Sequence, residues 1–157
     1  MPLTIWSGGQ TGVDRAAWDA AIRLHLPQFG WVPKGKIAED GTIPTRYRCR
    51  ETKGTDYVER TERNLMDADA TLILSFGPMG AGTQLTLELS RKHQRPHLWV
   101  DLDSMGMDEA LEKGLQFLRE RKPGTLNVAG PRGSYREDVY GRAKEYLTEL
   151  FESYGVK

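Results

Sequence analysis

The sequence predicts an α/β fold in which a parallel sheet is covered by helices on both faces. Short apolar segments alternate along the chain with longer segments whose apolar residues recur at helical spacing. The strongest short segment, residues 70–75, is apolar almost throughout, which is typical of a central strand buried on both faces. Such alternation is the pattern of strand–helix–strand units with parallel strands.

The first of these units begins close to the N-terminus. Residues 3–6 form an apolar run that ends just before Gly8 and Gly9, so we predict a buried strand there. Thr11 and Asp14 have the spacing of a capping box, which predicts a helix start. The helix that follows has a single apolar stripe, made of Val13, Ala16, Ala17, Ala20, Ala21 and Leu24.

Residues 29–53 do not follow either periodicity. Prolines and glycines interrupt the segment, but it also carries large apolar residues, so we predict an ordered loop. Its six basic residues outnumber its three acidic ones, namely Lys34, Lys36, Arg46, Arg48, Arg50 and Lys53 against Glu39, Asp40 and Glu51. Lys34 and Lys36, between Pro33 and Gly41, are candidates for the wall of a ligand site. The basic residues at 48–53 are expected to be solvated.

The remaining elements alternate regularly. A helix is predicted over residues 57–66, and the buried strand 70–75 follows it. A second helix starts near Thr83 and ends before Pro96, and residues 97–100 form another buried strand. Ser104 is a candidate N-cap for the next helix, whose apolar face includes Gly114. A strand over residues 126–129 and a helix over residues 139–151 complete the pattern.

Composition limits the classes of function. The 157 residues suggest one domain, spanning 1–157, and Lys+Arg and Asp+Glu balance at 22 each, which argues against general nucleic-acid binding. Cys49 is the only cysteine, so neither an internal disulfide nor an all-thiolate metal site is expected. The sequence shows neither a membrane-spanning run nor a signal peptide, and we therefore expect a cytoplasmic protein without membrane partners.

Three glycine-rich segments follow three predicted strands and each precedes a helix. Because parallel strands end at one edge of a sheet, residues 7–12, 77–82 and 130–134 should converge there. Helix N-termini and glycine backbone bind anions, which predicts a phosphate or oxyanion site. The candidate ligand-binding residues are Ser7, Gly8, Gly9, Gln10, Thr11, Arg15, Lys34, Gly77, Gly80, Gly82, Thr83, Gly130, Arg132 and Ser134.

Several enzyme classes are disfavoured by the same segments. Residues 8–12 lack the Gly-Lys-Ser/Thr ending of a P-loop, and their glycines do not have dinucleotide-binding spacing. His25, His93 and His97 lie outside the glycine-rich segments, so neither metal ligation nor histidine-based catalysis is expected. No catalytic residue is assigned.

Five blocks of the sequence carry a family resemblance. They are SGGQTGVDRAAWDAA (7–21), GWVPKGKIAEDGTIPTRY (30–47), ERTERNLMDADATLILS (59–75), GAGTQLTLELSRKHQRP (80–96) and LNVAGPRGS (126–134). Together they resemble the putative molybdenum carrier family, the molybdenum-cofactor carrier proteins, which is related to the cytokinin-activating phosphoribohydrolases of the lonely-guy type. The resemblance implies a Rossmann-like three-layer αβα fold with a mainly parallel sheet.

The resemblance also implies a function. It predicts a homo-oligomer, a tetramer or a dimer, that binds, protects and delivers molybdenum cofactor. This cofactor is a phosphorylated pterin whose metal is held by its own two sulfurs, so a carrier needs anion-binding loops rather than Cys or His ligands. Molybdate and phosphate are further candidate ligands.

Two departures from related sequences matter. Val32 stands where the family often has cysteine, and Thr86 stands where the hydrolases carry the glutamate of Gly-Gly-x-Gly-Thr-x-x-Glu. Glu88 lies about 200° further round the helix and cannot replace it. Two alternatives to a carrier remain open: a nucleoside-monophosphate phosphoribohydrolase-like enzyme that uses Asp14, Glu39 or Asp40, and a nucleotide-binding sensor. In the carrier interpretation Asp14 complements the helix dipole, and Glu39 and Asp40 fix the loop.

Overall fold

The computed structural model describes residues 3–155, and its strands and helices alternate as the sequence predicts. The first half of the chain forms β1 (Thr4–Trp6), α1 (Val13–Arg23), β2 (Gln28–Phe29), β3 (Trp31–Val32), β4 (Ile37–Ala38), β5 (Gly41–Thr42), β6 (Arg50–Glu51) and α2 (Tyr57–Asp67). The second half forms β7 (Ala70–Ser75), α3 (Ala81–Lys92), β8 (His97–Asp101), α4 (Met107–Arg121), β9 (Thr125–Ala129), the 3₁₀ turn η1 (Gly133–Tyr135) and α5 (Val139–Ser153).

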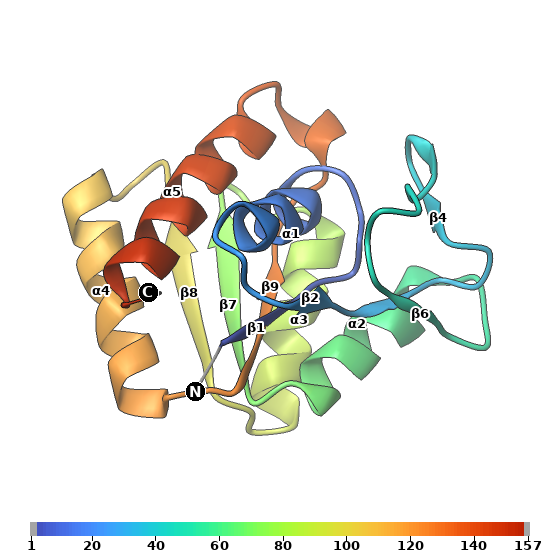
Figure 1. Ribbon diagram of the computed structural model, residues 1–157, viewed down its shortest axis with the longest axis horizontal. Helices are drawn as coiled ribbons and strands as arrows, with labels where there is room; N and C mark the ends of the chain where they lie inside the picture. The colour runs from blue at the N-terminus through green and yellow to red at the C-terminus, as the bar shows by residue number, and fades with distance from the viewer. Residues whose placement is uncertain (1–2, 156–157) are drawn as a thin grey trace.

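Five parallel strands form the central sheet in the order β2-β1-β9-β7-β8. Helices α1 and α5 pack together over one face with α4 beside α5, and α2 and α3 cover the other face (Figure 1). Every residue of β7 is buried, as expected for a strand paired on both sides and covered on both faces. The prediction of a Rossmann-like three-layer α/β fold is therefore confirmed.

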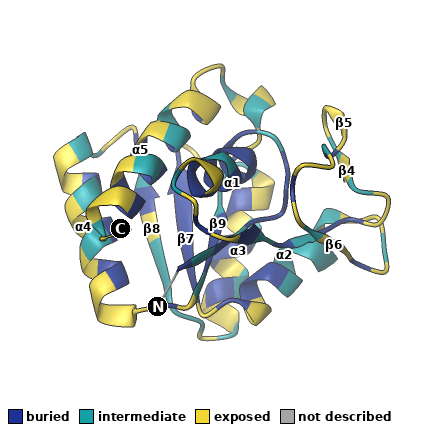
Figure 2. Cartoon of the chain, in the orientation of Figure 1, coloured by how far each residue is buried: buried dark blue, intermediate teal, exposed yellow. Residues whose placement is uncertain are grey.

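The main core lies between the sheet and the layer of α1, α4 and α5. The alanine-rich stripe of α1 is fully buried in it, and Figure 2 shows this helix as buried on its inner side. Gly114, on the buried face of α4, allows a close approach of α5, because a Cβ atom there would lie 2.6 Å from the Tyr146 hydroxyl. That hydroxyl donates a hydrogen bond of 2.8 Å to the carbonyl of Ala110.

The helix starts differ from the predictions. Gly12, with φ +80°, is the N-cap of α1 and no side chain caps the helix, so the predicted capping box of Thr11 and Asp14 is wrong. A Cβ atom at Gly12 would collide with the Pro131 carbonyl, and this close approach packs the first glycine-rich loop against the third. Ser104 is not the N-cap of α4 either, because that helix begins after Gly106.

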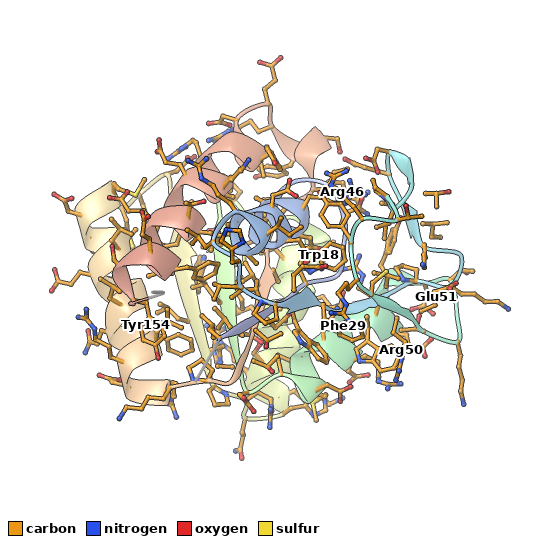
Figure 3. All side chains as sticks on the ribbon, in the orientation of Figure 1. Trp18, Phe29, Arg46, Arg50, Glu51 and Tyr154 are labelled. Atoms are coloured by element: carbon orange, nitrogen blue, oxygen red, sulfur yellow. The ribbon has the colours of Figure 1, made fainter. Side chains whose placement is uncertain are left out.

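The irregular segment is ordered, as predicted, but it also contains a strand that the sequence pattern does not reveal. Strand β2 pairs with β1 at the edge of the sheet, and the chain then forms short strand pairs beyond it. The segment packs on α1 through a second core of Trp18, Val32, Ile43 and Tyr47. The guanidinium carbon of Arg46 lies 4.4 Å from the centre of the Tyr47 ring, and Figure 3 shows Arg46 near Trp18.

Among residues 3–155, none of the helices has the length and hydropathy needed to cross a bilayer. The same part of the chain holds no group of three or more His, Cys, Asp or Glu side chains placed to bind a metal ion.

Candidate functional site: a cavity at the carboxyl ends of β9 and β7

A cavity of about 530 Å³ opens where strands β9 and β7 end. Its lining comes from four parts of the chain: the β1–α1 loop and start of α1, helix α2, the N-terminus of α3, and the loop after β9. The lining residues are Gln10, Asp14, Tyr57, Val58, Arg60, Thr61, Gly80, Ala81, Gly82, Thr83, Leu85, Thr86, Ala129, Gly130, Pro131, Arg132, Ser134 and Tyr135. The three glycine-rich loops therefore do converge at one sheet edge, as the parallel sheet requires.

The N-terminus of α3 forms one wall of the cavity. Its N-cap is Gly80, and within residues 3–155 the helix start has no side-chain cap. The first N–H groups of a helix have no intrahelical partner, so this turn offers donors and a partial positive charge. A Cβ atom at Gly80 or Gly82 would meet no other atom within 4 Å, which leaves the backbone at these positions accessible to a ligand.

Two arginines contribute positive charge. The guanidinium carbon of Arg60 lies 5.1 Å from the centre of the Tyr57 ring, and that of Arg132 lies 5.9 Å from it. The Arg60 side chain is only 12% exposed and lies over Gly8, where a Cβ atom would collide with the guanidinium. Gly8 is therefore required so that Arg60 can reach the cavity over the backbone of the first loop.

Arg60 has an incomplete set of partners. One terminal nitrogen lies 3.5 Å from an Asp14 carboxylate oxygen, whereas Nε is buried without a hydrogen-bond partner in the described part of the chain. A buried guanidinium with a free donor is costly unless a further acceptor completes it. Because Arg60 also lines the cavity, its guanidinium places positive charge beside any ligand there.

Asp14 is the only carboxylic acid among the lining residues in the described chain, and it is 4% exposed. Burial raises its pKa to about 6, although nearby Arg60 and a hydrogen bond from the Gln10 backbone N–H favour the ionised form. Asp14 was predicted to complement the dipole of α1. Its carboxyl group also lies beside Arg60 in the cavity lining, so the helix dipole is not its only electrostatic partner.

Gln10 lines the same cavity and has a side-chain donor without a partner among residues 3–155. Its side-chain oxygen accepts hydrogen bonds from the Glu39 N–H at 2.8 Å and the Thr11 N–H at 3.1 Å. These contacts fix the amide, whose Nε2 is buried without a partner among residues 3–155. The side chain is therefore held in place by the loop.

Half of the predicted binding residues line the cavity. These are Gln10, Gly80, Gly82, Thr83, Gly130, Arg132 and Ser134. The other half lie outside the lining, and three of them, Ser7, Gly8 and Gly9, belong to the first loop. Ser7 donates its hydroxyl to the Asp14 carbonyl at 2.9 Å, and the Gly9 carbonyl accepts from Arg15 Nε at 2.8 Å. Gly8, as described above, makes room for Arg60.

Thr11, Arg15 and Lys34 make contacts elsewhere. Thr11 donates its hydroxyl to Glu39 at 2.6 Å and accepts from the Gly133 N–H at 3.0 Å. Arg15 forms a bidentate pair with Asp40, with both N···O distances at 3.1 Å. Lys34 lies exposed in the turn after β3. Neither basic side chain contributes to the cavity wall.

Glu39 and Asp40 connect neighbouring segments through hydrogen bonds. Glu39 accepts from the Ser134 hydroxyl at 2.7 Å as well as from Thr11, and it therefore joins the first loop to the third. Partial burial opposes its ionisation, but the hydrogen bonds from Ser134 and Thr11 prevail and lower its pKa. The hydrogen bonds from Arg15 lower the pKa of Asp40. Neither carboxylate lines the cavity, so neither is placed as a catalytic group there.

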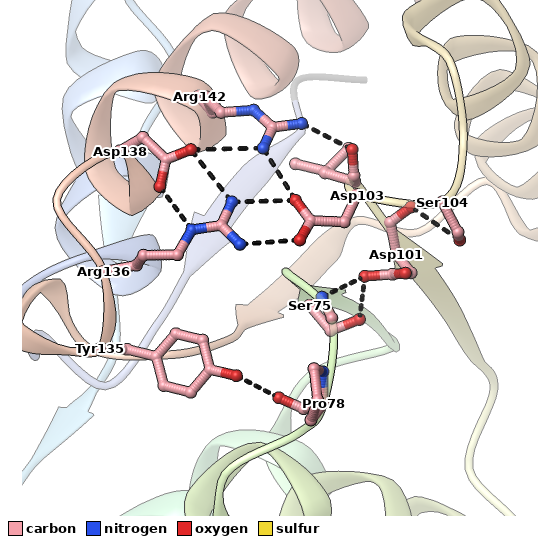
Figure 4. A network of polar contacts seen from close by, with 11 residues as sticks. Ser75, Pro78, Asp101, Asp103, Ser104, Tyr135, Arg136, Asp138 and Arg142 are labelled. Atoms are coloured by element: carbon pink, nitrogen blue, oxygen red, sulfur yellow. Dashed lines mark hydrogen bonds and ion pairs between the residues drawn. The ribbon is translucent and has the colours of Figure 1, made fainter.

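A network of arginines and aspartates lies next to Tyr135, which lines the cavity (Figure 4). Asp103, which follows β8, accepts from Arg136 at 2.7 Å and from Arg142 at 2.9 Å, and these two guanidinium groups hold its pKa well below the usual range. Tyr135 donates its hydroxyl to the Pro78 carbonyl. The network therefore connects the loops after β7, β8 and β9.

Gly77 belongs to this rim. Its N–H donates to Asp101 at 2.8 Å, and its φ of +82° suits glycine. Gly77 shapes the turn and does not line the cavity.

Thr86 lines the cavity, and its hydroxyl lies 3.3 Å from the Gly82 carbonyl, to which it donates. The side chain at this position of the cavity wall is therefore a hydroxyl and not a carboxylate. The sequence analysis did not identify Arg60 or Tyr57 as site residues. On sequence alone α2 is an ordinary amphipathic helix, and only its packing beside the first loop brings these residues to the cavity.

Comparisons with known proteins place the chain in a family. No curated protein matches the chain. Among solved structures, the chain is similar to the crystal structure of a protein named "Putative molybdenum carrier protein" from Syntrophus aciditrophicus SB, with 39% identity and a TM-score of 0.89 over 97% of this chain and 94% of that one. This similarity supports the resemblance seen in the sequence. The model of the circularly permutated YpsA SLOG family matches residues 5–151, and the chain belongs to that family.

Proposed function

We propose that this protein binds molybdenum cofactor in the cavity, protects it and delivers it. One observation carries the proposal: a single cavity is lined both by the uncapped N-terminus of α3 and by Arg60 and Arg132. Backbone donors and guanidinium groups around one volume suit a ligand with more than one anionic group. The name of the similar Syntrophus protein supports molybdenum cofactor as that ligand.

The chemistry of the cofactor matches the residues around the cavity. Its terminal phosphate suits the first turn of α3, and its pterin ring has polar edges that Gln10 Nε2 and Asp14 can bind. Tyr57 and Tyr135 provide aromatic walls for a flat ring. A volume of about 530 Å³ is of the size that small-molecule sites have. Because the metal carries its own two sulfur ligands, the protein needs no metal-binding side chains.

A second function has one observation in its favour. Asp14, whose pKa burial raises to about 6, is a carboxyl group within the cavity that could serve as a general acid or base. A phosphoribohydrolase-like reaction on a nucleoside monophosphate would use it in place of the glutamate that Thr86 replaces. A nucleotide-binding sensor would occupy the same cavity without turnover.

Retention of the cofactor decides between these functions. Purified protein is mixed with molybdenum cofactor, separated from free cofactor, and assayed for bound cofactor and for its survival in air. We expect retention and slower oxidation, and we expect no ribose 5-phosphate from AMP. Absence of retention together with ribose 5-phosphate release would reject the carrier in favour of the enzyme. Size-exclusion chromatography of the same sample tests the proposed homo-oligomer.

A further inference from the structure

Asp14 and Arg60 form an ion pair at the edge of the cavity that a bound anion would disturb. The two side chains are 6% and 12% exposed, and the closest N···O distance is 3.5 Å, which is long for a charge-assisted hydrogen bond. Both residues also line the cavity. Any anion that contacts Arg60 there must therefore lie close to the carboxyl group of Asp14.

The charge of Asp14 determines how well Arg60 can bind such an anion. An ionised carboxylate engages the guanidinium and repels a second anion, and this repulsion is weakly screened in a buried site. A protonated carboxyl group removes the repulsion and leaves the guanidinium to the ligand. Among residues 3–155, Arg60 Nε and Gln10 Nε2 have no hydrogen-bond partner, so the hydrogen-bonding capacity of the side chains around Asp14 is not used up.

The other charged and titratable groups around Asp14 do not change this conclusion. On its own helix, Arg15 is paired with Asp40, and on α2 the neighbour of Arg60 is Tyr57. From the loop after β9, Arg132 faces Tyr57 and adds positive charge. Since Asp14 is the only acid in the lining of the described chain, it is the group that loses its negative charge most readily when an anion enters.

We propose, resting on the anion site of the proposed function, that binding of an anionic ligand in the cavity is coupled to uptake of a proton by Asp14. A rise in pH then weakens binding and favours release. Because burial already raises the pKa of Asp14 to about 6, an added anion moves it toward neutral pH, where the coupling acts. By linkage, the ligand stabilises protonated Asp14 as much as the proton stabilises the bound ligand.

Sulfate is a suitable probe because its charge stays constant between about pH 5 and about pH 8. Its dissociation constant is measured by calorimetry across this range for the wild type, for Asp14→Asn and for Asp108→Asn, an acid in the first turn of α4 that lies outside the cavity lining. The affinity of the wild type and of Asp108→Asn for sulfate should fall about 10-fold from pH 5 to pH 7.5. The affinity of Asp14→Asn for sulfate should not change with pH, and at pH 7.5 this variant should bind sulfate more tightly than the wild type.

A second measurement on the wild type alone keeps the test independent of how Asp14→Asn folds. Calorimetry at about pH 7 in two buffers of different ionisation enthalpy should show uptake of about half a proton per sulfate bound. No proton uptake, or the same pH profile in wild type and Asp14→Asn, would overturn the coupling while leaving the anion site intact. No sulfate binding by any variant at any pH would overturn both the coupling and the proposed site.

Discussion

Replacing Gly82 by leucine is expected to abolish anion binding without unfolding the protein. Gly82 lies in the first turn of α3 with its backbone open to the cavity, and a Cβ atom there would meet nothing within 4 Å. The fold therefore tolerates the side chain, but the side chain occupies the space in which an anion would contact the helix N–H groups. Loss of two charge-assisted hydrogen bonds, each worth about 1.5–3 kcal/mol, weakens binding by about 100-fold or more.

Gly141 provides the matched control. It lies in α5, its Cβ position is also open, and it is not among the residues of the cavity. Both leucine variants should retain the circular dichroism spectrum and melt within a few degrees of the wild type. Only the Gly82 variant should lose binding of phosphate or molybdate in equilibrium dialysis. Wild-type affinity in Gly82→Leu would mean that the anion site lies elsewhere.

Replacing Arg60 by methionine is expected to produce the second largest loss. Methionine keeps the apolar stem over Gly8 but removes the guanidinium, which is the most buried positive charge in the cavity lining. Affinity for sulfate should fall by about 10-fold to 100-fold, as expected for one or two charge-assisted hydrogen bonds. Because Arg60 lowers the pKa of Asp14, the variant should also keep Asp14 protonated to higher pH.

Arg63→Met is the comparison variant on the same helix. Arg63 lies over the Trp31 ring at 3.9 Å and next to Asp67, and it does not line the cavity. Its loss should leave sulfate affinity within about twofold of the wild type, as for surface charges that contact no ligand. Equal losses in the two variants would indicate a general effect of charge on α2 and would argue against a specific role of Arg60.

The central sheet was predictable because the apolar pattern that indicates each main strand lies within the strand itself. An almost entirely apolar run such as residues 70–75 is best buried between two neighbouring strands and two helical layers, and the structure places β7 there. Strand β2 was not predictable, since it has only two residues, Gln28 and Phe29, and is defined by pairing with β1. The capping box failed because Gly12 and not Thr11 is the N-cap of α1, and the side chains of Thr11 and Asp14 contact Glu39 and Arg60.

The part of the candidate site that was predictable is the part made by glycine-rich loops, because such loops follow parallel strands that all end at the same edge of the sheet. Gly82 and Arg132 line the cavity for this reason. Arg15 and Lys34 looked equally suitable from their charge alone, but Arg15 is held by Asp40 and Lys34 is exposed in a distant turn. Arg60 was missed because its position depends on α2 packing against a glycine, a long-range contact that leaves no local pattern.

The most direct test of the central claim is the location of molybdenum in crystals of the protein grown with molybdenum cofactor. Diffraction data recorded on either side of the molybdenum absorption edge identify the metal by its anomalous scattering. The account predicts one strong peak per protomer within the cavity bounded by Gly82, Arg60 and Arg132. A peak at another surface, or crystals that hold cofactor with this cavity unchanged, would contradict it.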